Sequence, residues 1–188
     1  MDEARIRELV QEFIREIGED PTREGLERTP ARVASAWSYL TSGYRTDVDA
    51  VINEATFSHA DKNMIIVRDI EIYSVCEHHM LPFFGHCHIG YVPAGKVFGV
   101  SKLARLADMF ARRLQIQEKL TEQIAQVIMH KLEPHGVGVI IEAQHLCMMM
   151  RGVAKQGSLL TTSSMLGSFR DSRATRSEFL ALIGKPSA

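Results

Sequence analysis

Two neighbouring stretches, MIIVRDIEIYSV at residues 64–75 and HCHIGYVPAG at residues 86–95, decide the fold class. Both are rich in β-branched or alternating apolar residues and are bounded by turn residues, a pattern typical of β-strands. A loop separates them. We therefore expect a pair of antiparallel strands.

Two helical patterns follow the strand pair. Apolar residues recur at three- and four-residue steps in SKLARLADMFARRL (residues 101–114) and in EKLTEQIAQVIMHKL (residues 118–132). Ser101 is a good capping residue and is expected to start the first of these helices. Pro134 and Gly136 are expected to end the second.

Two further strands and a last helix complete the pattern. VGVIIEAQHLCMMM (residues 137–150) and SLLTTSSML (residues 158–166) are predicted strands, and EFLALI (residues 178–183) is a predicted short helix. Strands and helices are segregated in the order ββααββ. We expect an α+β domain, an antiparallel sheet with two helices on one face.

Two helices are expected in the N-terminal part of the chain. One apolar helical face precedes Gly18, which can end the helix, and Thr29 with Pro30 is expected to start a second helix. We predict an N-terminal helical extension over residues 1–60 and the principal domain over residues 61–188.

Composition places the chain among ordinary folded proteins. Its 188 residues are 45% hydrophobic and 24% charged, with a formal net charge of −1, so no global field attracts nucleic acid or an anionic membrane. No apolar run approaches the roughly 20 residues needed to span a bilayer. The acidic, helical N-terminus lacks the basic start of a secretory signal. We expect a cytoplasmic protein that binds neither nucleic acid nor membranes.

The cysteines indicate a metal site. Three cysteines in a reducing compartment favour metal binding, reactivity or core packing over disulfides, and Cys87 is interpreted as a small buried hydrophobe. Cys76 and His79 lie three residues apart in a loop, a spacing that loops use to begin a zinc site. In the fourth predicted strand the period of two puts His145 and Cys147 on one face. Cys147 can therefore be a third ligand.

Two thiolates and one imidazole would form an open site. Such a set leaves the fourth tetrahedral position of zinc to water, whose pKa zinc lowers to about 7, so the site would be hydrolytic. Two other interpretations stay open. His86 and His88 could complete a closed structural site with Cys76 and His79, and the tandem His78 and His79 could be surface histidines.

Basic residues and one carboxylate flank this region. Lys102 and Arg105 lie one turn apart near an expected helix N-terminus, where anions are favoured, and Arg151 and Lys155 follow the fourth strand. They could hold phosphates or belong to solvated surfaces. Glu118 could bind a ligand or only favour the helix dipole. No phosphate-binding loop motif occurs, so side chains would have to hold any nucleotide.

Four segments together resemble the GTP cyclohydrolase I family between Asp20 and Ile183. They are DPTREGLERTPARVASAW, CEHHMLPFFG, GVSKLARLADMFARRLQIQEKLTEQIA and HLCMMMRGV. The resemblance implies the tunnelling fold for a catalytic domain, with GTP as substrate and Zn²⁺ as cofactor. It also implies a toroidal homodecamer whose active sites are shared between subunits.

The resemblance also implies roles at the metal. By it, the zinc ligands are Cys76, His79 and Cys147, and His78 and His145 lie beside the metal as proton-transfer groups. The family uses zinc to activate the water that attacks C8 of GTP. Protonation of the purine makes C8 electrophilic, a task that suits a histidine titrating near neutral pH, and His145 is the candidate.

Substrate-binding roles follow in the same way. Glu118, with help from Gln117, matches the carboxylate that anchors guanine. In the family, C8 is released as formate and the remainder is rebuilt as 7,8-dihydroneopterin triphosphate, so the resemblance implies the first step of tetrahydrofolate and pterin biosynthesis. The residues that match triphosphate-binding positions are Ser101, Lys102, Arg105 and Arg151.

Two competing functions can be stated. One is a nitrile reductase of the same fold, with a nucleophilic cysteine, a nicotinamide cofactor and no metal; the pair of Cys76 and Cys147 with His79 argues against it. The other is a non-catalytic metal-binding or scaffold protein. The presence of Glu118, His145 and Arg151 argues against that.

Overall fold

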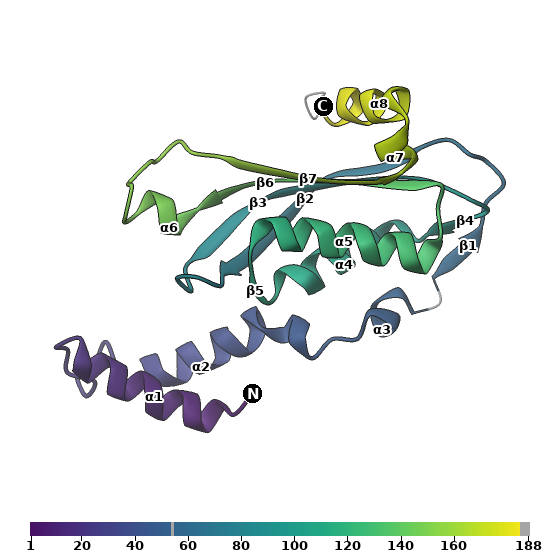
Figure 1. Ribbon diagram of the computed structural model, residues 1–188. Helices are drawn as coiled ribbons and strands as arrows, with labels where there is room; N and C mark the ends of the chain where they lie inside the picture. The colour runs from purple at the N-terminus through teal and green to yellow at the C-terminus, as the bar shows by residue number, and fades with distance from the viewer. Residues whose placement is uncertain (54, 185–188) are drawn as a thin grey trace.

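The predicted antiparallel strand pair is confirmed. In the computed structural model, which describes residues 1–53 and 55–184, β2 (Ile65–Cys76) lies antiparallel to β3 (Pro82–Val92) in the middle of a long sheet (Figure 1). Because β2 ends at Cys76, the polar turn that follows it lies at one end of this sheet.

Two further strands extend the sheet in the predicted antiparallel manner. β6 (Gly136–His145) pairs with β3, and β7 (Leu160–Gly167) pairs with β6. β5 (Leu114–Gln115), too short to show a sequence pattern, pairs in parallel with the end of β2, which gives the order β5-β2-β3-β6-β7. A separate small sheet joins β1 (Thr56–Ser58) to β4 (Lys96–Phe98).

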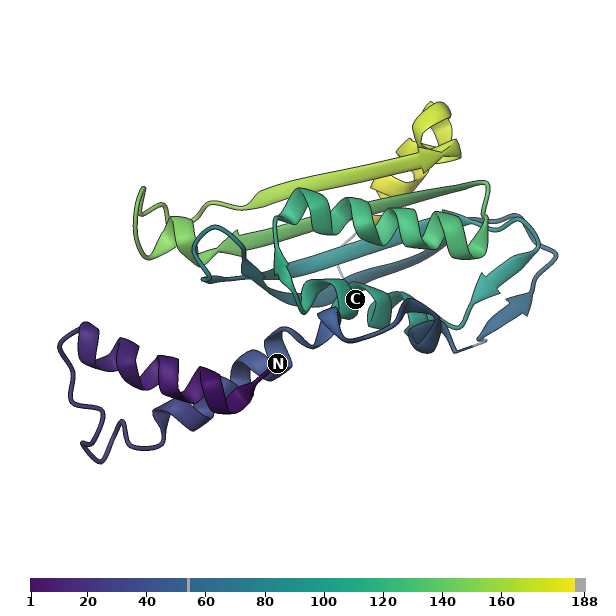
Figure 2. The same ribbon diagram turned by 60° about the horizontal axis from the view of Figure 1, so that its bottom comes forward.

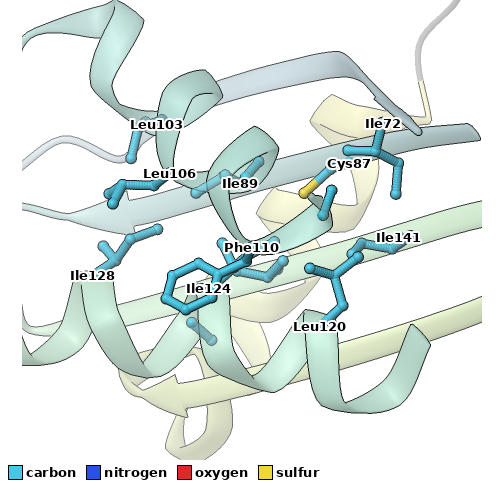
Figure 3. Close-up of a cluster of buried hydrophobic side chains, with 14 of the residues drawn as sticks. Ile72, Cys87, Ile89, Leu103, Leu106, Phe110, Leu120, Ile124, Ile128 and Ile141 are labelled. Atoms are coloured by element: carbon cyan, nitrogen blue, oxygen red, sulfur yellow. The ribbon is translucent and has the colours of Figure 1, made fainter. Parts of the chain in front are cut away.

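Two helices cover one face of the sheet, as predicted. They are α4 (Val100–Ala111) and α5 (Gln117–Leu132), whose apolar sides meet the inward side chains of the strands (Figure 3). The N-cap of α4 is Gly99, because its carbonyl accepts from the Lys102 N–H, so the expectation that Ser101 caps this helix is wrong. Fully buried members of this core include Ile72, Cys87, Ile89, Leu106, Leu120, Ile124, Ile128 and Ile141.

The C-terminal helices lie against the opposite face. α7 (Ser168–Asp171) and α8 (Arg173–Ile183) bring Phe169 and Phe179 together edge to face, with ring centroids 5.3 Å apart. A Cβ atom at Gly138 would lie 2.4 Å from the Phe169 ring, so the strand approaches that closely only because it carries glycine there. The predicted closing helix is confirmed and is longer than its sequence signal.

An N-terminal helical hairpin projects from this body (Figures 1 and 2). It consists of α1 (Glu3–Glu16), which Gly18 ends with φ +87, and α2 (Thr29–Leu40). Both helices were predicted, but Thr29 is not the cap. The N-cap of α2 is Arg28, without a side-chain hydrogen bond, and Thr29 is the first helical residue.

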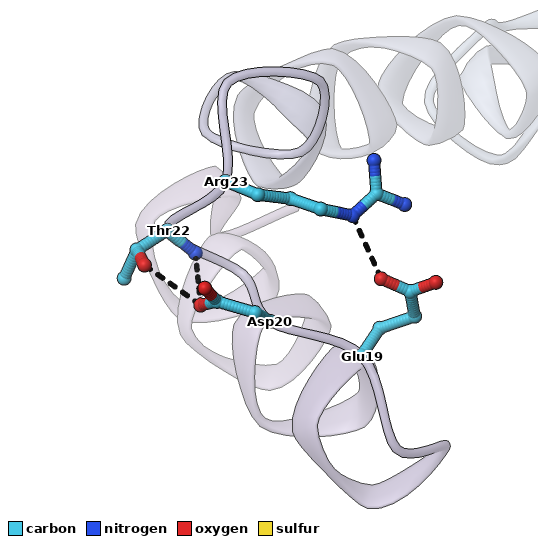
Figure 4. A network of polar contacts seen from close by, with 4 residues as sticks. All are labelled: Glu19, Asp20, Thr22 and Arg23. Carbon is cyan, nitrogen blue, oxygen red and sulfur yellow. Dashed lines mark hydrogen bonds and ion pairs between the residues drawn. The ribbon is translucent and has the colours of Figure 1, made fainter.

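The loop of this hairpin is held by local polar contacts (Figure 4). The Asp20 carboxylate accepts from the backbone N–H of Thr22 at 2.8 Å and from its hydroxyl at 2.7 Å, and these bonds lower the pKa of Asp20. Arg23 pairs with Glu19 at 2.7 Å. The DPTREG segment therefore orders the turn between α1 and α2.

The segment between the hairpin and the sheet contacts both. η1 (Ser42–Tyr44) continues from α2, and α3 (Val48–Ile52) packs on α4. The last residues before position 61 thus lie against the sheet domain, and the division into 1–60 and 61–188 stays a prediction. Among the residues that the structure describes, no helix is both long and apolar enough to span a bilayer.

Candidate metal and nucleotide site

The turn after β2 brings His79 back toward Cys76. The Met80 N–H donates to the Cys76 carbonyl at 2.8 Å, and the Cys76 N–H donates to the Leu81 carbonyl at 2.9 Å. The Glu77 N–H donates to the β5 backbone at 3.0 Å. Three backbone bonds therefore fix this loop, with Cys76 buried and His79 exposed.

Cys147 reaches the same place from a different element than expected. β6 ends at His145, and Cys147 lies in the short helix α6 (Leu146–Met149), so its assignment to a strand is wrong. The helical turn still places the Cys147 sulfur beside the loop after β2. The candidate ligand atoms of Cys76, His79 and Cys147 all lie within 4.8 Å of one another.

The alternative closed cluster does not form. Within residues 1–53 and 55–184, the trio of Cys76, His79 and Cys147 is the one group with metal-ligand spacing. His86 is exposed in the middle of β3, and His88 is buried there, where its Nδ1 accepts from the Asp69 N–H at 3.1 Å.

The chemistry of the trio fits a cation. Both cysteines are free thiols. Burial and then the neighbouring Cys76 sulfur raise the pKa of the Cys147 thiol, so two thiolates at this spacing need a positive charge between them. A divalent cation supplies that charge and holds thiols deprotonated.

His145 lies beside this trio as the last residue of β6. Its ring stacks on Phe83 with centroids 4.5 Å apart and planes 4° from parallel. Nε2 lies 2.8 Å from Gln117 Oε1, and Nδ1 lies 4.0 Å from Cys147 Sγ. Burial lowers the pKa of His145, and the nearby Glu118 carboxylate opposes this shift. The net lowering of the pKa favours the neutral ring near pH 7.

Two other predicted residues join the metal end. His78 is exposed, with Nδ1 3.9 Å from Cys76 Sγ. Arg151, in the loop after α6, donates to His79 Nε2 at 3.2 Å. A guanidinium and an imidazole therefore flank the candidate ligands from exposed positions.

The two residues predicted to bind guanine differ in their exposure to solvent. Glu118 is exposed in the first turn of α5. Gln117, one residue before it, is fully buried and hydrogen-bonded within the chain. The contact of Gln117 with guanine stays a prediction. Neither its bond to His145 nor the stacking of Phe83 was foreseen, since both join residues far apart in the sequence.

The other predicted phosphate ligands lie elsewhere in the chain. Ser101, Lys102 and Arg105 are in the first half of α4, next to β4, whereas α4 ends beside β5 and the metal end (Figure 1). A helix of 12 residues is about 18 Å long. Lys102 is buried with Nζ donating to the Val51 carbonyl at 2.9 Å, and Arg105 borders a hollow of about 320 Å³.

These observations define a class of protein: an α+β enzyme scaffold with a Cys-His-Cys candidate metal site beside a buried histidine. The family model of GTP cyclohydrolase I matches residues 6–184, and the chain belongs to that family of enzymes with the tunnelling fold.

Curated relatives agree with the family model. A GTP cyclohydrolase 1 of Methylococcus capsulatus is 59% identical over 94% of this chain and 96% of its own, and one of Teredinibacter turnerae is 60% identical over 94% and 96%. Among solved structures, the apo form of the archaeosine synthase QueF-Like has a TM-score of 0.49 at 15% identity, covering 57% of this chain and 97% of that chain. The family assignment rests on the sequence matches.

Proposed function

We propose that this chain is a cytoplasmic, zinc-dependent GTP cyclohydrolase I that converts GTP and water to 7,8-dihydroneopterin triphosphate and formate, the first step of tetrahydrofolate and pterin biosynthesis. The observation that carries the proposal is the trio of Cys76, His79 and Cys147, whose ligand atoms lie within 4.8 Å. Free cysteines are consistent with a reducing compartment.

Zinc is the proposed ion because of the donor set. Two thiols and one imidazole are ligands that suit Zn²⁺, and a set of three leaves a position for water or substrate. When bound, zinc would supply Lewis-acid activation of water for hydrolysis.

His145 and His78 are the proposed proton-transfer groups. His145 is held in one ring orientation by Phe83 and Gln117, which suits a group that must deliver a proton to a defined atom. His78 is exposed beside Cys76 and can exchange protons with solvent.

Substrate recognition is assigned to charged side chains. Glu118 is proposed to accept from N1–H and the 2-amino group of guanine, which is consistent with its exposed position near His145. Gln117 is proposed to assist it indirectly, because its buried amide is hydrogen-bonded within the chain. The proposed triphosphate ligands are Arg151, at the metal end, and Ser101, Lys102 and Arg105, at the start of α4.

The separation of these phosphate ligands supports a site shared between subunits, in a toroidal homodecamer. A second support is the apolar stripe on α1, where Leu9, Phe13 and Ile17 lie one turn apart and are 42%, 63% and 60% exposed. Such a stripe on a projecting helix is typical of a surface that another subunit covers.

The activity is tested directly with purified protein and GTP. Formate and a pterin chromophore should appear together, and a chelator should abolish both until Zn²⁺ is restored. Turnover that needs a nicotinamide cofactor instead would support the reductase, and zinc-loaded protein without turnover would support the non-catalytic scaffold.

The shared site is tested by mixing two inactive chains. Arg105→Ala removes a proposed triphosphate ligand, and Cys147→Ala removes a metal ligand. If each site combines the metal end of one subunit with the α4 start of another, co-assembled chains should regain part of the activity. Mixed assemblies that stay inactive would show that both groups come from one subunit.

A further inference from the structure

The amide of Gln117 has its orientation fixed by its partners. Its Nε2 donates to the carbonyls of Ile141 at 3.0 Å and Leu160 at 2.9 Å, and Thr162 Oγ1 is a third acceptor at 3.1 Å. A carbonyl oxygen can only accept, so an amide turned the other way would set oxygen against oxygen. The Gln117 oxygen must therefore point away from these two carbonyls.

The hydroxyls of two threonines require the same orientation of the Gln117 amide. Thr121 Oγ1 lies 2.7 Å from the Gln117 backbone carbonyl and must donate to it. Thr162 Oγ1, 2.7 Å from Thr121 Oγ1, must then donate to Thr121, which leaves it to accept from Gln117 Nε2. The two hydrogens of Gln117 Nε2 are thus shared among three acceptors, all of which require the same orientation of the amide.

The orientation of the Gln117 amide determines which ring nitrogen of His145 carries a hydrogen. Gln117 Oε1 lies 2.8 Å from His145 Nε2 and can only accept, so Nε2 must carry a hydrogen. In a neutral ring, Nδ1 then carries the lone pair, and Nδ1 is the nitrogen 4.0 Å from Cys147 Sγ. Stacking on Phe83 keeps the ring from turning away.

We infer that Gln117 is a positioning residue that holds His145 as the Nε2–H tautomer, with Nδ1 directed to the candidate metal site. This assignment rests on the proposed function only where it gives His145 a proton-transfer role. It differs from a direct contact with guanine, because Gln117 acts through the imidazole and its own amide is saturated inside the chain.

The test compares Gln117→Met with a matched control. Methionine keeps the length of the side chain and removes the acceptor. Gln115→Met is the control, because Gln115 is also buried, on β5, and its amide donates to the Phe110 carbonyl and to Gln123 without contacting His145. The two variants lose buried amide bonds alike, and only one of them frees the imidazole.

We expect Gln117→Met to keep its zinc and a KM for GTP within about twofold, while kcat falls at least about tenfold, since a buried hydrogen bond to the ring is lost. Gln115→Met should keep kcat within a few-fold. A rise in KM with unchanged kcat would instead indicate a guanine contact and overturn the positioning role. Equal losses of kcat in both variants would also overturn it, because packing alone would explain them.

A second readout does not depend on turnover. Solid-state ¹⁵N NMR of histidine-labelled protein, with His145 assigned by difference from His145→Ala, should show a protonated Nε2 and an unprotonated Nδ1 in the parent. This readout is taken on the parent protein, so it tests the tautomer even if Gln117→Met fails to fold. A protonated Nδ1 in the parent would overturn the inference, whereas zinc-loaded parent with the expected tautomer but no GTP turnover would count only against the proposed function.

Discussion

Cys87 lies in the middle of β3, fully buried in the core under α4 and α5, whereas Cys76 and Cys147 lie where β2 and β6 have just ended. Burial raises the pKa of the Cys87 thiol, and the residues around it are apolar, so it behaves as a small hydrophobe. At the sheet end the other two thiols meet His79. The same residue type is inert where strands continue and becomes a candidate ligand where they stop.

The largest expected effect is on Cys147→Ala. Two remaining ligands should not retain zinc, so metal and activity should be lost together. Cys87→Ala, the matched change in the middle of the sheet, should keep both near normal. Zinc content and GTP turnover of the two variants check the comparison, and stoichiometric zinc in active Cys147→Ala protein would remove Cys147 from the site.

His145→Ala should separate metal binding from catalysis. His145 adjoins the trio without belonging to it, so zinc should stay while product formation falls by about 100- to 10,000-fold, the usual contribution of a general acid or base. The measurement is kcat with metal analysis on the same sample. Turnover within a few-fold of the parent would show that His145 is only a packing partner of Phe83.

Glu118→Gln tests the exposed edge of the same region. Guanine presents two adjacent donors, so replacing one carboxylate oxygen with a donor amide mismatches one of them. Such mismatches cost about 1–3 kcal/mol, and kcat/KM for GTP should fall at least about tenfold without loss of zinc. Glu122→Gln, one turn further along α5 and also exposed, is the control and should be near normal. Equal kcat/KM in the two variants would leave Glu118 only a helix-dipole role.

The smallest expected effect concerns His88, in the middle of the sheet. Burial lowers its pKa, opposed by Asp69 and then Glu142, while His86 and Arg68 lower it further. The unfolded chain therefore binds more protons as the pH falls through about 6.5, and the free energy of unfolding should decrease there.

His88→Asn keeps an acceptor for the Asp69 N–H and removes this titration. Denaturant unfolding of metal-free parent and variant at pH 7.5 and 5.5 measures the difference. The variant should lose less stability on acidification, and identical losses would mean that His88 is not the titrating group.

The length of the fourth predicted strand was wrong, and the pairing of the neighbouring strands explains the error. The strand predicted over residues 137–150 stops at His145 because the ladder with β3 ends at Phe83 opposite His145, and that with β7 ends earlier, at Leu160 opposite Ala143. With no strand left to pair, the chain closes a helical turn, in which the Met150 N–H donates to the Leu146 carbonyl at 3.0 Å. Apolar residues alone do not reveal where a neighbouring strand ends.

The sequence by itself determined the α+β class and the order of the main helices and strands, because periodicity is a local property. It offered Cys76, His79 and Cys147 as metal ligands but left a closed site with His86 and His88 open. Only the tertiary structure decided that Cys147 joins the trio from a helix and that Gln117 is turned inward to His145. It also separated Arg151, at the metal end, from the other predicted phosphate ligands, in the first half of α4. These are contacts between residues tens of positions apart. They depend on how strands register and how far a helix carries the chain, which no local pattern encodes.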